Sequence, residues 1–210
     1  MNRLRLYPNL PLCTLAWAAA VLLTSTAQAG SPASIYCPPI GFVTGNTALN
    51  ANFEVNQPGV PVGTETCWTP RSGSTDSAAK NWTMHSSNDG DKVCSTLLPS
   101  NAPYGKSGLM LKFKAGGNEG GVFQSIPNAT GKTYMFSAWV KVIKGQVAVL
   151  SSAGNTGPVS WSTKHGEWEE LRVCTDSTGA SDTMGIYNED PNGGLFYIDR
   201  VELRETSPGP

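Results

Sequence analysis

Asp199 is a charged side chain in a predicted buried strand, and such a side chain needs a chemical partner. It lies in "GLFYIDRVEL", a run of apolar and β-branched residues that is typical of a buried strand. A carboxylate in such a strand must be neutralised by a cation or satisfied by hydrogen bonds. Arg200, Arg204 or backbone amides are the partners that the sequence itself offers at this point.

The other side chains that could do chemistry form no recognisable catalytic arrangement. Glycoside hydrolysis requires two carboxylates about 5 to 10 Å apart across a cleft. Glu169 and Glu170 are neighbours on a predicted strand, so they point to opposite faces and cannot form that pair. His85 and His165 are isolated, and the sequence contains neither GxSxG nor HExxH. We therefore expect a protein that binds rather than catalyses.

Aromatic residues in or beside polar turns are candidates for ligand binding. Flat apolar side chains can stack on the rings of a ligand, while amide groups form hydrogen bonds with its polar groups. Trp139 alternates with the apolar positions of its strand, and a tryptophan on the outer face of a sheet needs a covering layer or a ligand. The predicted ligand-binding residues are Trp82, Trp139, Trp161 and Tyr187, with Gln124 and Asn188 as polar partners. Trp82 could equally be a core residue that opens a strand.

Four cysteines remain once a predicted leader is set aside: Cys37, Cys67, Cys94 and Cys174. An even number in an exported protein predicts two disulfides, for which spacing alone permits three connectivities. Cys67 and Cys94 could clip the segment between them, leaving Cys37 to reach Cys174. A zinc site is the alternative, but no CxxC or paired histidine supports it.

The leader is the segment 1–29, which has the layout of a secretory signal peptide. A short basic start precedes the uncharged apolar run 15–23, and "AQA" at 27–29 is a small-x-small cleavage site. The apolar run is too short for a membrane span, so we expect cleavage near Ala29 and a secreted or periplasmic product. Loss of two arginines leaves 13 basic against 16 acidic side chains, a net charge of −3. A weakly acidic protein is a poor candidate for binding nucleic acid.

Short runs of alternating apolar and polar residues follow, separated by turns rich in Gly, Pro, Asn and Asp. The clearest is "KTYMFSAWVKV", and others are "GLMLKF", "GVFQSI", "GQVAVL", "EELRVC", "TMGIYN" and "LFYIDRVEL". Helical periodicity never extends beyond a turn or two. The pattern predicts an all-β fold, an antiparallel β-sandwich or jelly roll. We expect a lead-in at 30–47, the sandwich at 48–205 and a tail at 206–210.

The order of these segments carries a family resemblance. "LNANFEVN", "GKSGLMLKF", "GGVFQSIP", "GKTYMFSAWVKV", "EWEELRV" and "GLFYIDRVEL" follow one another. Over residues 48–205 this order resembles the jelly-roll carbohydrate-binding modules found beside xylanases and glucanases, in the galactose-binding-domain-like group. The resemblance implies a structural calcium between the first and last strands, a metal that takes six to eight oxygen ligands. The implied ligands are Asn52, Glu54 and Asp199, with backbone carbonyls around Lys106.

The same resemblance implies a function. It indicates an exported, monomeric, non-catalytic protein that binds a polysaccharide or glycan, with Trp168 as a core residue. The alternative is a structural or adhesion module on the cell surface that binds protein. A third possibility is a small polysaccharide lyase of the jelly-roll type, although the Tyr or His and the neutralising Arg, Asn or Gln that such an enzyme needs cannot be assembled from the sequence.

Overall fold

The computed structural model describes residues 45–49, 51–53, 66–69, 75–79, 81–86, 91–99, 101–105, 107–113, 115, 120–126, 131–152, 159–177, 182–188 and 190–206. All of these belong to one compact unit, Pro32–Pro210, and the predicted signal peptide lies outside them. Their regular secondary structure consists of strands. A helix long and apolar enough to cross a membrane does not occur in this part of the chain.

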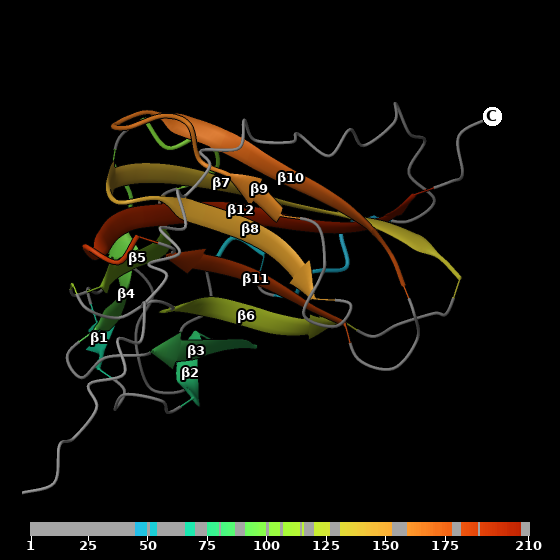
Figure 1. Ribbon diagram of the computed structural model, residues 1–210, viewed down its shortest axis with the longest axis horizontal. Coiled ribbons are helices and arrows are strands. Elements are labelled where there is room, and N and C mark those ends of the chain that lie inside the picture. The colour runs from blue at the N-terminus through green and yellow to red at the C-terminus, as the bar shows by residue number, and fades with distance from the viewer. Residues whose placement is uncertain are drawn as a thin grey trace, which may run out of the picture. The chain divides into compact units, whose positions relative to one another are not determined.

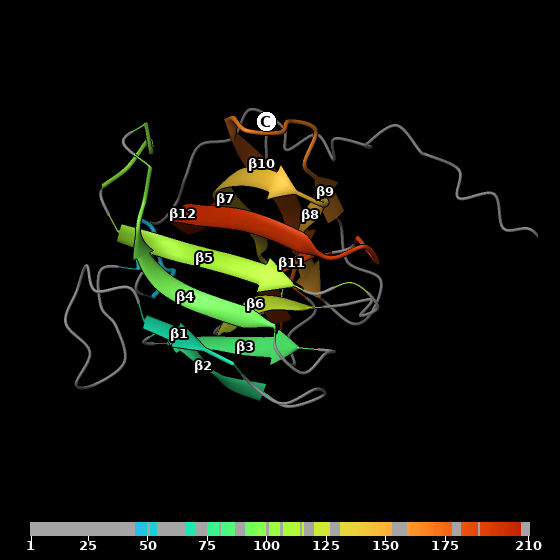
Figure 2. The ribbon, with the colours of Figure 1, turned by 90° about the vertical axis from the view of Figure 1, so that its left-hand side faces the viewer.

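The described strands form two antiparallel sheets that pack face to face as a sandwich (Figure 1). In sheet A the strand order is β1 (Thr66–Trp68), β4 (Lys92–Leu97), β5 (Ser107–Phe113), β12 (Gly194–Thr206), β7 (Thr133–Lys144) and β10 (Trp168–Asp176). In sheet B the order is β2 (Thr75–Ala79), β3 (Trp82–Ser86), β6 (Gly120–Ile126), β11 (Asp182–Asn188), β8 (Val147–Ser152) and β9 (Val159–Trp161). Figure 2 looks onto β4, β5 and β12 of sheet A. The predicted fold class is confirmed.

Strand β7 shows how the sequence produces the core between the sheets. Phe136, Ala138, Val140 and Val142 are each 0 % exposed and belong to the central cluster. Because successive side chains of a strand point to opposite faces, the intervening Trp139 lies on the outer face, where it is half-buried. The seven patterned runs of the sequence are β5, β6, β7, β8, β10, β11 and β12. The strands β1, β2, β3, β4 and β9 were not among these runs.

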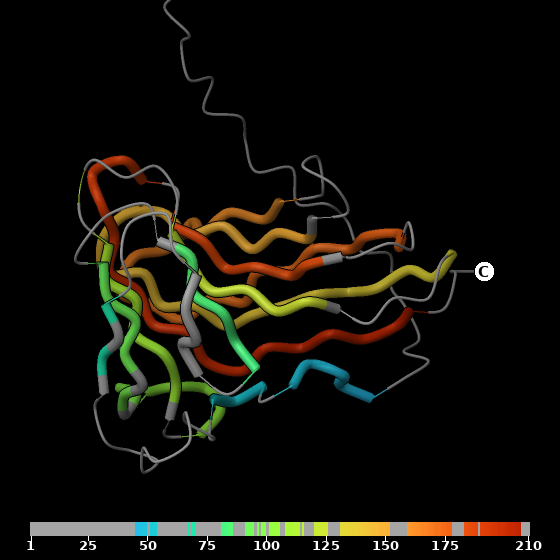
Figure 3. Tube along the Cα trace, turned by 90° about the horizontal axis from the view of Figure 1, so that it is seen from below, coloured from blue at the N-terminus to red at the C-terminus, as the bar shows by residue number. Residues whose placement is uncertain are grey.

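Strand β12 joins the two ends of the described chain. It pairs with β7, and its register shifts between Asp199 and Val201. Beyond that shift the Val201 N–H donates to the Ala51 carbonyl at 2.8 Å, and the Thr47 N–H donates to the Leu203 carbonyl at 2.8 Å. Figure 3 shows this early segment, in blue, running alongside the red β12. The beginning of the predicted sandwich therefore lies against its last strand.

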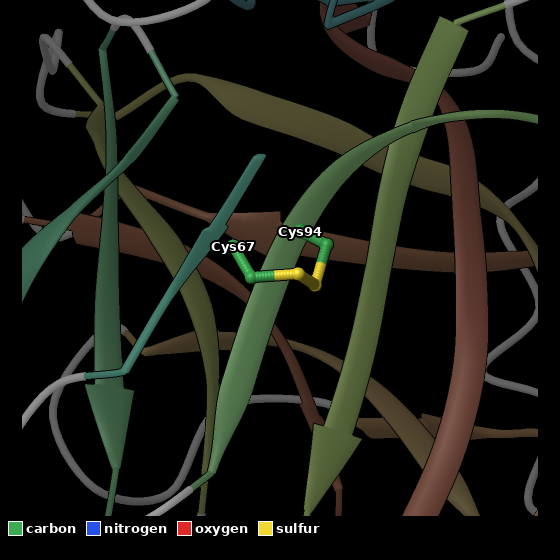
Figure 4. Close-up of a disulfide and its surroundings, with 2 residues drawn as sticks. All are labelled: Cys67 and Cys94. Carbon is green, nitrogen blue, oxygen red and sulfur yellow. A yellow bond between two sulfur atoms is a disulfide. The ribbon is translucent and has the colours of Figure 1, made fainter. Parts of the chain in front are cut away.

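The cysteines fall on sheet A. Cys67 on β1 and Cys94 on β4 are directly opposite each other and form a disulfide (Figure 4). Cys174 on β10 is also disulfide-bonded. Cys37 lies outside the described residues, so its pairing with Cys174 stays a prediction. The bond between Cys67 and Cys94 ties the edge strand β1 to its neighbour.

Candidate functional site

The outer face of sheet B gathers aromatic side chains from strands that are far apart in the sequence. The strand registers align, in order across the sheet, His85 (β3), Gly121 (β6), Tyr187 (β11), Ala148 (β8) and Trp161 (β9). Residues directly opposite each other in antiparallel strands project from the same face. Trp161, Tyr187 and His85 therefore form one row across the sheet.

The row points away from the core because its neighbours along each strand point into it. These neighbours are Met84, Val122, Ile186 and Val149, each 0 % exposed. Side chains alternate along a strand, so the row must occupy the opposite face. His85, Tyr187 and Trp161 are half-buried, as expected for side chains on the outside of a sheet. The predicted ligand residues Tyr187 and Trp161 are thus brought together.

Two glycines allow the ring of Tyr187 to lie close to the sheet. A Cβ added at Gly185 would meet three atoms of that ring, Cε2, Cδ2 and Cζ, at 3.0 Å or less. A Cβ added at Gly121 would lie 2.8 Å from Cδ1 of the same ring. The ring therefore covers backbone that only glycine leaves free. The ring lies against the sheet at these two positions.

A second row on the same face adds a residue that sequence reasoning missed. The registers align Thr83 (β3), Phe123 (β6), Gly185 (β11) and Leu150 (β8). Phe123 is half-buried here, next to the buried Val122 of the core. The alternation of "GVFQSI" would have indicated this orientation, had Val122 been assigned to the core first. His85 was missed in the same way. We call His85, Phe123, Tyr187 and Trp161 the aromatic platform.

The aromatic platform contains no Asp, Glu, Lys or Arg side chain. The ion pairs formed by the described residues join Lys132 to Glu205, Lys164 to Glu167, Arg172 to Glu170, and both Arg200 and Arg204 to Glu202. These pairs lie on strands of sheet A or on segments next to them. A flat apolar surface without charge suits the face of a neutral sugar ring.

Trp82 is in the core, which corrects its prediction as a ligand-binding residue. It is 1 % exposed, and its ring centroid lies 5.2 Å from that of Phe53. It opens β3, and the apolar interior between the sheets takes up the whole indole. An open pocket of about 300 Å³ beside it is lined by Leu49, Asn81, Trp82, Thr83, Gln124 and Ser125. The side chain of Trp82 is almost fully buried and offers no surface for stacking.

Gln124, another predicted ligand-binding residue, forms its hydrogen bonds within the protein. Its Nε2 donates to the Leu49 carbonyl at 3.1 Å and to the Asn81 carbonyl at 2.9 Å, and its Oε1 accepts the Leu49 N–H at 2.9 Å. Both amide protons are therefore used, and the side chain is 6 % exposed. Gln124 fastens the early segment around Leu49 to the turn before β3.

Asn188 is buried as well, because it alternates with Tyr187 on β11. The side chain is 1 % exposed, and its Nδ2 donates to the Asp190 carbonyl at 3.0 Å. Its Oδ1 faces Gly194 and would lie 3.2 Å from a Cβ added at Gly145. The predicted polar ligand-binding residue Asn188 therefore lies on the face opposite to Tyr187, since adjacent strand residues point to opposite faces.

Trp139 lies on the outer face of sheet A, apart from the aromatic platform. Its ring meets Tyr104 edge to face, with centroids 5.8 Å apart, and the guanidinium of Arg200 lies 4.0 Å from the centroid of Tyr104. On the same face, the hydrogen bond from Arg172 to Glu170 raises the pKa of Arg172 above its ordinary value. Tyr104 therefore covers part of Trp139 on this face.

Asp199 is 0 % exposed, as its sequence context predicted. Its Oδ2 accepts the Tyr104 N–H at 2.9 Å, and its Oδ1 accepts the Arg200 N–H at 2.7 Å. The predicted partner Asn52 is exposed, next to Phe53 with a φ of 55°. The other predicted ligands, Glu54 and Lys106, lie outside the described residues.

A calcium ion fits this region in donor chemistry but only one described carboxylate is in place. The Ala51 carbonyl, on the early segment beside β12, accepts the Val201 N–H, and calcium takes carboxylate and carbonyl oxygens as ligands. Within the described ranges no three His, Cys, Asp or Glu side chains converge in a way that could hold a metal. Contact with backbone amides is observed, and the calcium ion stays a prediction.

Comparisons with known proteins identify the fold. The sequence matches no protein-family model and no curated protein. Among solved structures, it is similar to the CBM22-1–GH10 modules of endo-1,4-β-D-xylanase 10B from Clostridium thermocellum, complexed with xylohexaose. The identity is 14 %, the match covers 80 % of this chain and 29 % of that one, and the TM-score is 0.50.

Two further solved structures are similar. The enzymatically active domain of tailspike protein 4 from bacteriophage CBA120 matches at 11 % identity and a TM-score of 0.50, over 76 % of this chain and 21 % of that one. TmCBM61 in complex with β-1,4-galactotriose matches at 16 % identity and a TM-score of 0.49, over 76 % of this chain and 98 % of that one. The protein thus has the jelly-roll fold of carbohydrate-binding modules, a fold that also occurs in an enzyme.

Proposed function

We propose that the protein is an exported, non-catalytic carbohydrate-binding protein whose aromatic platform holds a neutral polysaccharide chain. The observation that carries this proposal is the register row that places Trp161, Tyr187 and His85 on one uncharged face. Aromatic rings in a row suit the apolar faces of successive sugars. The predicted leader supports export, and the fold shared with modules complexed with oligosaccharides supports a binding role.

The spacing of the row suits a linear chain that lies across the strands. Neighbouring strands are about 4.8 Å apart, so Trp161 and Tyr187, two strands apart, are separated by about 10 Å, as are Tyr187 and His85. A pyranose unit in an extended chain is about as long as one strand spacing. Alternate sugars would therefore stack on the rings. The small residues Ala148 and Gly121 lie between the rings in the row, and both are buried.

Affinity gel electrophoresis tests this function. The full chain would be run through gels containing xylan, mixed-linkage β-glucan, mannan, pectin or chitin. We expect retardation by at least one neutral polymer, and loss of it in Trp161→Ala and in Tyr187→Ala. The matched control is Trp139→Ala, which removes the same ring from sheet A and should leave retardation unchanged.

Other outcomes would contradict the proposal. If no polymer retards the protein, a module that binds protein becomes the better account. Release of unsaturated sugar ends, followed by their ultraviolet absorbance, would indicate a lyase. Loss of retardation in Trp139→Ala, with Trp161→Ala unaffected, would place the site on sheet A instead.

We also propose that a structural calcium ion binds beside Asp199. The support is the burial of this carboxylate at the junction of the two chain ends, together with the implied ligands Asn52, Glu54 and Lys106. The ion would stabilise the fold by drawing these segments together, away from the aromatic platform. Sugar binding would then depend on calcium only through folding.

A further inference from the structure

The outer face of sheet A carries lysines that form no ion pair with the acidic side chains of the described residues. Lys92 on β4 lies directly opposite Lys112 on β5. Val93 and Leu111, the next residues along these strands, are each 0 % exposed in the core. Because side chains alternate, both lysines point outward, and both are exposed. Two positive charges thus face each other across neighbouring strands.

The same face continues this pattern toward the centre of the sheet. Lys112 is opposite Leu195 on β12, and Leu195 is opposite Lys144 at the end of β7. One row over, Lys141 on β7 lies between Tyr197 and Trp168. Tyr197 and Trp168 are half-buried there, which corrects the expectation that Trp168 is a core residue. We call Lys92, Lys112, Lys141, Lys144, Tyr197 and Trp168 the basic stripe. Figure 2 faces this side of the sandwich, with β4, β5 and β12 in front.

The lysines of the basic stripe are not neutralised by the described carboxylates. The ion pairs of the described residues involve other cations. Lys144 donates to the Asn192 carbonyl at 3.0 Å and Lys141 to Asn101 Oδ1 at 3.4 Å, and both acceptors are uncharged. Like charges directly opposite each other destabilise a sheet. This arrangement occurs in a chain whose net charge is −1, so it is a local excess.

Protection of a sheet edge does not account for the stripe. Lysines often guard edge strands against pairing with other molecules. Lys112, however, is paired on both sides, by Lys92 on β4 and by Leu195 on β12. It lies in the interior of the sheet, where no edge needs protection. The positive charge there is therefore left without a structural explanation and is available to a ligand.

We propose that the basic stripe is a second binding surface, for an anionic polysaccharide whose sugars carry carboxylate or sulfate groups. Lys92, Lys112 and Lys144 would pair with charges along the chain. Tyr197 and Trp168 would stack on its sugar rings, with Lys141 between them. Neighbouring strands are about 4.8 Å apart, so a chain running across the strands meets positive charges at about the spacing of its own sugars.

The rings favour a saccharide over other polyanions. Tyr197 and Trp168 flank Lys141 and are two strands apart, about 10 Å, in the same register row. A lipid surface would contact the lysines, but it would make no specific contact with half-buried rings at a fixed spacing within a sheet. This surface is on the opposite side of the sandwich from the aromatic platform and differs from it in charge, so the two proposals stand independently.

The experiment compares polygalacturonate with its fully methyl-esterified form, which has the same sugars without the charge. Affinity gels and titration calorimetry would use the full chain at low and at high salt. We expect binding to polygalacturonate or to a sulfated galactan at low salt, weakened by salt, and none to the ester. Lys92→Gln with Lys112→Gln should weaken binding about tenfold. Trp161→Ala, on the other sheet, should leave it unchanged.

A matched variant separates the stripe from net charge. Lys132→Gln with Lys164→Gln removes two charges elsewhere, each from an ion pair, and should leave polygalacturonate binding as in the wild type. Equal weakening by both double variants, or no binding to any anionic polymer, would overturn the proposal. So would binding to phosphatidylserine vesicles that depends on Lys92 and Lys112 while the polymers fail to bind. If the protein failed to bind neutral polymers but still bound polygalacturonate, the result would contradict the proposal for the aromatic platform and not the one for the basic stripe.

Discussion

The Tyr104 N–H donates to the buried Oδ2 of Asp199 at 2.9 Å, across 95 positions of sequence. The ring of Tyr104 is then held against Trp139, with centroids 5.8 Å apart, and beneath Arg200 at 4.0 Å. The carboxylate thus anchors the loop 101–105 on the outer face of sheet A. This contact joins the region of the predicted calcium ion to the aromatic residue that the sequence singled out on that face.

Asp199→Asn with and without a chelator separates the two accounts of this carboxylate. If calcium is bound, EDTA should lower the melting temperature of the wild type, because a ligand at a hundredfold excess over its Kd contributes about 2.7 kcal/mol. The variant should be less stable and nearly insensitive to EDTA. If Asp199 accepts hydrogen bonds from backbone amides and no calcium is bound, Asp199→Asn should lower the free energy of unfolding by about 1 to 3 kcal/mol, both with and without EDTA. An unchanged wild-type melt in EDTA would contradict the calcium proposal.

Gly185→Ala tests the aromatic platform without removing a ring. The added methyl group would occupy space now taken by the ring of Tyr187, and the ring can swing away while the strand stays in place. We expect polysaccharide affinity to fall about fivefold, since stacking interactions of this size are worth about 1 kcal/mol. Calorimetry would measure it. Gly45→Ala is the control, because nothing lies within 4 Å of its added Cβ.

Gln124→Leu should affect stability rather than recognition. The substitution keeps the volume but leaves the Leu49 N–H, the Leu49 carbonyl and the Asn81 carbonyl without their partner. We expect a loss of about 2 kcal/mol in the free energy of unfolding, measured with urea. Affinity measured on the folded protein should be unchanged. Ser125→Ala, at an exposed neighbour, should change neither, and a ligand-specific defect in Gln124→Leu would refute the structural role.

Removal of the Cys67–Cys94 disulfide should weaken the edge of sheet A. The bond closes a loop with a sequence separation of 27, and the loss of such a crosslink costs about 3 kcal/mol in the chain-entropy account. Cys67→Ser with Cys94→Ser would be compared with the wild type by urea unfolding. Binding at the aromatic platform should persist, because the bond lies on the other sheet. A variant as stable as the wild type would show that β1 contributes little.

Much of the fold could be predicted because it depends on local alternation. In β7 the apolar positions are separated by one residue, so the strand and its two faces follow from the sequence, including Trp139 on the outside. The burial of Asp199 followed from the apolar residues around it. Short strands escaped prediction, as did the orientation of Trp82, because a tryptophan next to polar turns satisfies both a core and a surface position.

The sites depended on information that is not local. Alternation can place Tyr187 and Trp161 on some outer face, but only pairing through β8 brings them into one row. The same pairing sets Lys92 opposite Lys112 and separates Trp139 from the aromatic platform. Sequence determined seven of the strands and, in β7, which side chains face the core, since these follow from a period of two. Tertiary structure alone decided which outer faces coincide, because strand order and register are set by contacts between distant segments.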